Sequence, residues 1–129
     1  ANVVGVLQLD MTNYIKPSAN NTLYLVEDHT HQQQNTFLVK LIKHYLPELT
    51  VGTTRCGYAC SDHASWSRRG YPASFPFETA LENLNPYIHT THDTLDNSDR
   101  QGQQALKFSK LALAYAVELG SKTQAHPSH

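Results

Sequence analysis

Apolar residues in this chain fall into short runs, separated by stretches in which they follow a helical spacing. Four runs have the β-branched and aromatic composition of strands: residues 3–10, 22–26, 50–54 and 73–77. The first run is apolar almost without a break, which predicts a strand buried on both faces of a parallel sheet. Pro76 in the last run predicts an edge strand or a strand end.

Two longer segments carry their apolar residues on one helical face. The first covers residues 31–46, and Pro47 follows where that helix should already have ended. The second has the clearest pattern in the chain, with an apolar face made of Phe108, Leu111, Ala112, Tyr115 and Leu119. Gly120 is expected to close this last helix.

A short third helix is expected over residues 62–69. Ser61 is suited to cap its amino-terminal end, and Gly70 to adopt the left-handed conformation that ends many helices. Strands that alternate with helices along a chain are typical of an α/β fold. We therefore expect part of a mostly parallel sheet flanked by helices.

The composition indicates one folded unit. The chain has 129 residues and a mass of 14.5 kDa, which is enough for one domain. Hydrophobic residues make up 40% and charged residues 16%, which argues against disorder and against a coiled coil. We expect the folded part to cover residues 1–121 and the polar residues 122–129 to form a flexible tail.

Charge and hydropathy argue against two classes of partner. The 10 basic and 11 acidic residues give a net charge of -1, so there is no excess of positive charge to attract nucleic acid or an anionic membrane. No apolar run approaches the roughly 20 residues that a membrane-spanning helix needs. Eight histidines are many for this length and direct attention to metal or proton chemistry.

Asp10 and His89 are the first candidates for metal ligands. Asp10 ends the first expected strand, at the edge where open α/β sheets bind their ligands, although an aspartate there can also simply cap a turn. His89 lies in an expected loop beside threonines and Asp93. A histidine in that setting either ligates a metal, with the neighbouring polar groups orienting it, or is solvated.

Cys56 and Cys60 are the only cysteines. Their spacing allows a small disulfide loop, which would place the chain in an oxidising compartment, and it equally allows two buried free thiols. A zinc site with four cysteines is excluded, because two further thiolates are missing.

Four motifs follow one another in a set order: L-Q-L-D-M-T-N at 7–13, C-G-Y-A-C-S-D-H-A-S-W at 56–66, G-Y-P-A at 70–73 and N-P-x-I-H-T at 85–90. Together they closely resemble the carboxyl-terminal half of the bacterial leucyl aminopeptidases, which are secreted exopeptidases with two zinc ions. The resemblance covers roughly residues 2–121. It implies a zinc-exopeptidase-like fold whose amino-terminal half is absent from this chain, and a secreted or periplasmic location.

The resemblance also implies a role for each residue of an active site. Asp10 would ligate one zinc and His89 the other, and Tyr58 would hydrogen-bond the developing oxyanion. Cys56 and Cys60 would form a disulfide on either side of Tyr58. The substrate is expected to be a peptide with a free amino terminus and a bulky apolar first residue. The pocket for that side chain would be lined by Met11, Phe75, Phe77, Leu81, Leu84 and Ile88.

The chain departs from the family pattern in one important respect. The family takes three further metal ligands and its general base from the amino-terminal half, as a histidine, a bridging aspartate and a pair of adjacent glutamates. No two of the five glutamates in this chain are adjacent. One ligand for each metal cannot hold a two-zinc site, since catalytic zinc ordinarily takes three protein ligands. We expect the chain to be inactive alone and to need the missing half as its partner.

Two alternatives remain open at this point. The chain could be a non-catalytic binding or structural module that keeps the same scaffold. It could also work like the glutaminyl cyclases, which share this architecture and use a single zinc. The motif C-G-Y-A-C-S-D-H favours the aminopeptidase.

Overall fold

The computed structural model describes residues 2–16 and 21–124. The strands are β1 (Val6–Leu7), β2 (Thr22–Val26), β3 (Thr50–Thr54), β4 (Ala73–Ser74) and β5 (Pro76–Phe77). The α-helices are α1 (Gln32–Tyr45), α2 (His63–Arg68) and α3 (Gln103–Gln124). Two short 3₁₀ helices, η1 (Leu81–Asn83) and η2 (Leu95–Asn97), lie in the long connection between β5 and α3.

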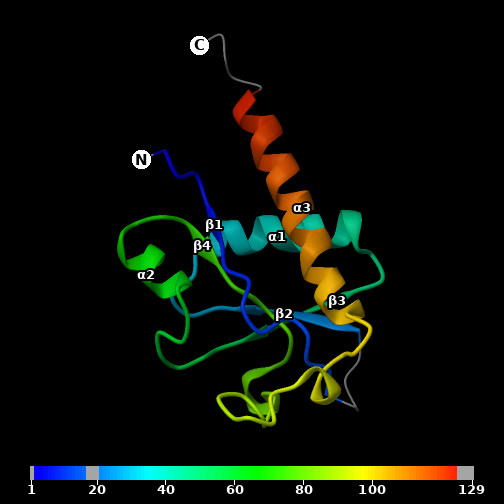
Figure 1. Cartoon of the computed structure of the whole chain (residues 1–129). Helices are drawn as coiled ribbons and strands as arrows, with labels where there is room; N and C mark the ends of the chain where they lie inside the picture. Colours follow the sequence, from blue (N-terminus) through cyan, green and yellow to red (C-terminus); the bar gives the residue numbers. More distant parts are fainter. Residues whose placement is uncertain (1, 17–20, 125–129) are drawn as a thin grey trace.

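The strands form a mostly parallel arrangement, as the sequence predicts. β1 pairs with β4 in parallel, and β2 pairs in parallel with β3 along its whole length, from Thr22 opposite Thr50 to Val26 opposite Thr54. β5 joins the other edge of β2 in the antiparallel direction. The chain is therefore an α/β structure with helices beside its strands (Figure 1).

β2 separates the hydrophobic core from the candidate site. Successive side chains of a strand point to opposite faces, so Leu23 and Leu25 face one side and Val26 the other. The two leucines belong to a core built with α1 and α3, completed by residues such as Leu38, Ile42, Phe108 and Leu111. Val26 belongs to a second cluster with Phe75 and Phe77. Figure 1 shows α1 and α3 crossing on the first side, with the long loops of residues 80–100 at the opposite end of the molecule.

α1 and α3 confirm the two helical patterns in the sequence. α1 begins and ends within one residue of the expected range, and the side chain of His31 accepts the cap hydrogen bond from the Gln34 N–H. Among the described residues, no helix combines the length and the apolar composition that crossing a membrane requires.

A buried polar network ties the two helices to the strands. The amide group of Gln34 donates to the Val6 carbonyl at 2.9 Å and to the Ser74 hydroxyl at 3.1 Å. Its oxygen accepts from the Tyr115 hydroxyl at 3.1 Å, and burial raises the pKa of that hydroxyl to about 12. The network leaves no room for a side chain at position 5, because a Cβ there would collide with the Tyr115 hydroxyl. Gly5 is thus required by a close approach of α3 to the first strand.

The first strand is shorter and less buried than its sequence predicts. It covers only Val6–Leu7 instead of residues 3–10, and Val4 beside it is 60% exposed. Within the described residues β1 pairs only with β4, so its other edge carries no strand. The residues of β1 suit a strand that is buried on both faces, but within the described residues this strand lies at an open edge.

The expected strand 73–77 is in fact two strands with different partners. β4 pairs with β1, and β5 pairs with β2. The chain crosses from one pair to the other at Phe75, whose carbonyl accepts from the Val26 N–H at 3.0 Å. Pro76 has no N–H to donate, which suits the start of an edge strand.

Two predicted helix ends are wrong. The Ser61 hydroxyl donates to Asp10 instead of capping α2, and the capping position falls to Asp62, which makes no side-chain cap hydrogen bond. α3 continues past Gly120 to Gln124, because a glycine lowers helix stability by only about 1 kcal/mol and need not end a packed helix. Gly70 does adopt the expected left-handed conformation, with φ of 84°. Residues 125–129 of the expected tail lie outside the described residues.

A matched pair of substitutions on α3 tests the helical core. Leu111 is fully buried and Leu113, two residues further, is 66% exposed. We expect Leu111→Ala to lower the free energy of unfolding of this chain by about 2–5 kcal/mol, through lost burial and the cavity left behind. Leu113→Ala should change it by no more than about 0.5 kcal/mol. Urea unfolding of both variants measures this, and similar losses in the two would contradict the packing described.

Candidate active site

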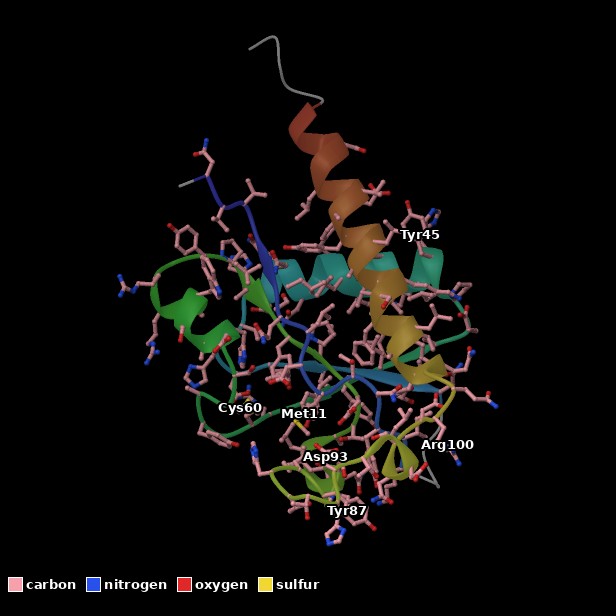
Figure 2. All side chains as sticks on the ribbon, in the orientation of Figure 1. Met11, Tyr45, Cys60, Tyr87, Asp93 and Arg100 are labelled. Carbon is pink, nitrogen blue, oxygen red and sulfur yellow. A yellow bond between two sulfur atoms is a disulfide. The ribbon has the colours of Figure 1, made fainter. Side chains whose placement is uncertain are left out.

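One cavity of about 260 Å³ brings the predicted site residues together. It is lined by Asp10, Met11, Cys56, Tyr58, Cys60, Phe75, Phe77, Leu81, Leu84, Ile88, His89 and Asp93. Each residue that the sequence analysis assigned to metal, substrate or disulfide lies on this wall. In Figure 2 the labelled Met11, Cys60 and Asp93 lie close together at the end of the molecule opposite the tip of α3.

The backbone is held in a left-handed conformation at two places on the cavity wall. Met11, directly after Asp10, has φ of 59°, and His89 has φ of 62°. Such a conformation costs an ordinary residue about 1–2 kcal/mol and persists only where the surrounding structure imposes it. The strain thus falls on one candidate metal ligand, His89, and on the residue directly after the other, Asp10.

Asp10 is held by the disulfide loop. One of its carboxylate oxygens accepts from the Ser61 hydroxyl at 3.0 Å, and Ser61 directly follows Cys60. The second oxygen has no hydrogen-bond partner among the described residues. A carboxylate oriented in this way keeps one oxygen available for a cation.

The segment after Met11 is tied to the start of α3 and to the end of β5. The Tyr14 N–H donates to Glu78 Oε2 at 2.6 Å. The Asn13 side chain donates to the Asp99 carbonyl at 2.8 Å, and the Asp99 N–H donates back to the Asn13 carbonyl at 2.9 Å. These contacts position the chain that carries Asp10 between elements that are far apart in the sequence.

Glu78 is a buried carboxyl group with an unusual protonation behaviour. Burial raises its pKa from the ordinary 4.5 to about 7, against hydrogen bonds from Tyr14 and Asn13 that lower it. The negative charges of Asp93 and Asp10 raise it further. Oε1 of Glu78 has no hydrogen-bond partner within the described part of the chain. Its pKa is higher in the folded than in the unfolded chain, so folding is favoured most at low pH and less as pH rises toward 7.

Glu78→Gln is expected to remove this pH dependence. Between about pH 5 and 8 the wild-type chain should lose about 1–3 kcal/mol of unfolding free energy to ionisation of the buried carboxyl. Glu78→Gln should lose correspondingly less over the same range, while Glu82→Gln, an exposed glutamate nearby, should follow the wild type. Urea titrations at a series of pH values measure the difference. Parallel profiles in all three proteins would show that Glu78 is not responsible.

The disulfide expected from the resemblance is present between Cys56 and Cys60. It closes a loop in which Gly57 has φ of 83° and the Tyr58 side chain is 64% exposed. Tyr58 therefore projects from a short covalent ring at the mouth of the cavity.

The remaining wall of the cavity is apolar. The rings of Phe75 and Phe77 meet edge to face with centroids 5.2 Å apart, and Met11, Leu81 and Leu84 pack against the same cluster. The Leu81 N–H donates to the Thr54 hydroxyl at 2.9 Å, which fixes η1 to β3. A wall of this kind suits a bulky apolar side chain.

The described residues do not by themselves form a metal centre. An aspartate and a histidine are suitable donors for zinc. Within residues 2–16 and 21–124, however, no group of three or more histidine, cysteine, aspartate or glutamate side chains could hold a metal ion. The types of donor fit zinc, but the described residues provide too few donors for a zinc site.

The sequence analysis missed several residues around the site. It assigned Ser61 to a helix cap and gave no role to Glu78 or Asp28, although the Asp28 carboxylate accepts from two N–H groups of the disulfide loop. It gave no role to His63 either, which is fully buried and whose ring packs against Phe75 with centroids 4.7 Å apart. The long sequence separation of these contacts leaves no local signal for them.

Comparison with known proteins shows the family of this chain. The family model of peptidase family M28 matches residues 1–114. The chain therefore belongs to peptidase family M28.

Similar proteins include two with aminopeptidase in their names. A probable leucine aminopeptidase of Arthroderma otae is 38% identical over 117 residues, which cover 91% of this chain and 31% of that protein. The crystal structure of the Legionella pneumophila LapA aminopeptidase matches with a TM-score of 0.83 and 43% identity, over 90% of this chain and 30% of that one. LapB from the same organism matches with a TM-score of 0.83 and 39% identity, over 90% of this chain and 31% of that one. The chain thus spans about a third of the length of the relatives it matches.

Proposed function

We propose that this chain is the carboxyl-terminal part of a leucyl-type metallo-aminopeptidase. The complete enzyme would release bulky apolar residues from the amino terminus of peptides. One observation carries the proposal: a carboxylate, an imidazole, a phenol and an apolar wall, all expected from the family resemblance, line one cavity. Family membership and the names of the similar proteins support the same activity.

Each part of the cavity has a role in this proposal. Asp10 and His89 would each bind one of two zinc ions. When bound, the ions supply a water of lowered pKa and polarise the scissile carbonyl. Tyr58 would donate a hydrogen bond to the oxygen that becomes negative in the transition state. The apolar wall around Phe75 and Phe77 would hold the side chain of the first residue.

The proposal includes a partner, namely the part of the enzyme that supplies the other metal ligands and the general base. Two surfaces of this chain support it. The first is the open edge of β1, where an apolar strand lies half exposed. The second is the outer face of α3, where Leu106, Leu113 and Val117 are exposed at helical spacing. Large apolar side chains exposed together mark surfaces that another segment covers.

The α3 surface borders a groove of about 310 Å³. It is lined by Tyr45, Leu46, Lys110, Leu113, Ala114 and Val117. We expect the rest of the enzyme to cover this groove. Leu113→Ala should scarcely change the stability of the isolated chain. It would then lower the stability of the completed enzyme, in which this side chain is covered.

A secreted or periplasmic location is part of the proposal. The Cys56–Cys60 disulfide supports it, because disulfides persist in oxidising compartments and are rare in reducing ones.

The test uses a completed enzyme, in which residues 1–129 are fused to the part of Legionella LapA that they do not match. With zinc present, the completed enzyme should hydrolyse leucine anilides and remove leucine from peptides, and the isolated chain should not. Product analysis on a peptide that begins with glutamine distinguishes hydrolysis from cyclisation. Cyclised product would favour the glutaminyl-cyclase alternative, and a folded, metal-loaded fusion without activity would favour a non-catalytic module.

A further inference from the structure

We infer that Asp28 is a positioning residue for Tyr58, acting through the backbone of the disulfide loop. The inference rests on the proposed function, because it concerns the residue proposed to contact the oxyanion. Asp28 Oδ1 accepts from the Cys56 N–H at 3.0 Å, and Oδ2 accepts from the Gly57 N–H at 2.7 Å. One carboxylate thus holds two successive amides immediately before Tyr58.

The loop has few other restraints on this side. Gly57 has φ of 83°, and nothing lies within 4 Å of the place where a Cβ would be. Tyr58 itself makes no hydrogen bond to the described residues. The disulfide joins Cys56 to Cys60, and Ser61 binds Asp10, so the far end of the loop is fixed. At the near end Cys56 also packs against the apolar cluster, and the Asp28 carboxylate is the one hydrogen-bond acceptor among the described residues for the Cys56 and Gly57 amides.

Asp28 is in turn fixed to the central strand. It follows β2 by two residues, and the Glu27 N–H donates to the Thr54 carbonyl at 2.9 Å. The next residue, His29, has the left-handed φ of 57°, and the Thr30 hydroxyl donates to the Val26 carbonyl at 2.9 Å. The turn that presents the carboxylate is therefore a continuation of β2.

Both acceptor oxygens are needed, which only an ionised carboxylate provides. Burial raises the pKa of Asp28, but the hydrogen bonds from Cys56, Gly57 and its own N–H outweigh this and leave the pKa below the ordinary 3.8. An amide side chain of the same shape offers one acceptor and one donor. Asp28→Asn therefore sets a donor against one of the two N–H groups while it preserves volume.

The first test measures amide hydrogen exchange by NMR in the 129-residue chain. In the wild type the Cys56 and Gly57 amides should exchange at least about tenfold more slowly than the Tyr58 amide in the same exposed loop. Asp28→Asn should speed exchange at both positions by at least about tenfold, and Asp96→Asn, an exposed aspartate, should not. Unprotected amides in the wild type, or unchanged exchange in Asp28→Asn, would overturn the inference without any measurement of activity.

The second test measures kinetics in the completed enzyme. Asp28→Asn should lower kcat about tenfold with KM changed less than about twofold, because the phenol is misplaced where charge develops. In the background of Tyr58→Phe it should lower kcat by less than about twofold, because the group it positions is already gone. If the loss of kcat in the double variant equals the product of the losses in the two single variants, Asp28 does not act through Tyr58. A completed enzyme without activity would count against the proposed function, and amide exchange would still decide the role of Asp28.

Discussion

Alanine at Asp10 or at His89 is expected to lower kcat/KM of the completed enzyme by at least about a thousandfold. Loss of a group that only orients a metal ligand typically costs 10–100-fold, so about a thousandfold is a cautious figure for loss of a ligand itself. The folded chain should survive both substitutions, because the two side chains lie on the exposed wall of the cavity. Hydrolysis of a leucine anilide at saturating zinc measures the loss.

Substitutions of another histidine and another aspartate outside the cavity serve as controls. His92→Ala removes an exposed histidine of the loop that carries His89, and Asp96→Asn removes an exposed carboxylate nearby. Neither residue lines the cavity. Both variants should retain activity within about twofold of the wild type. An equal loss in His92→Ala and His89→Ala would mean that the loop, and not a ligand, had been damaged.

Tyr58→Phe should lower kcat about 100- to 1,000-fold and leave KM nearly unchanged. Removing one donor to a developing oxyanion has an effect of this size, and the interaction exists only in the transition state. The substitution removes only the hydroxyl of a side chain that is 64% exposed, so the fold should be unaffected. Steady-state kinetics over a range of substrate concentrations separate the two parameters.

Tyr87→Phe is the matched control for this substitution. Tyr87 is also exposed, lies two residues before His89 and does not line the cavity. Loss of the Tyr87 hydroxyl should leave kcat and KM nearly unchanged. A rise in KM for Tyr58→Phe with kcat unchanged would show that Tyr58 binds the substrate in its ground state and is not an oxyanion donor.

Much of the fold could be predicted from local patterns. The strands 22–26 and 50–54 have the predicted bounds, since both are rich in residues that favour strands and both lie beside another strand. α1 was predicted to within a residue at each end because periodicity and a following proline coincide there. Apart from Asp93, the residues that line the cavity were named through the family resemblance, and their roles in binding metal and substrate stay predictions.

The errors occur where distant contacts outweigh local preference. Ser61 is a good helix cap in isolation, yet its hydroxyl donates to Asp10, 51 residues away in the sequence. Gly120 would end an isolated helix, but α3 is held by its buried face and continues. The run 73–77 divides because its two halves meet different strands. None of these outcomes could be derived from neighbouring residues.

The prediction of the first strand is wrong for a different reason. A sequence suited to burial on both faces is half exposed, and the edge of β1 away from β4 has no partner among the described residues. The residues of this run suit burial, and the described part of the chain buries them only in part. Such a mismatch is what we expect where another part of a domain packs.

The central claim, that this chain contributes one ligand to each of two metal ions, is tested most directly by zinc stoichiometry. Equilibrium dialysis with metal analysis is carried out on the isolated chain, the completed enzyme and its Asp10→Ala and His89→Ala variants. The account predicts no tightly bound zinc in the isolated chain, two ions in the completed enzyme, and the loss of one ion in each variant. Two tightly bound ions in the isolated chain, or two retained in both variants, would contradict it.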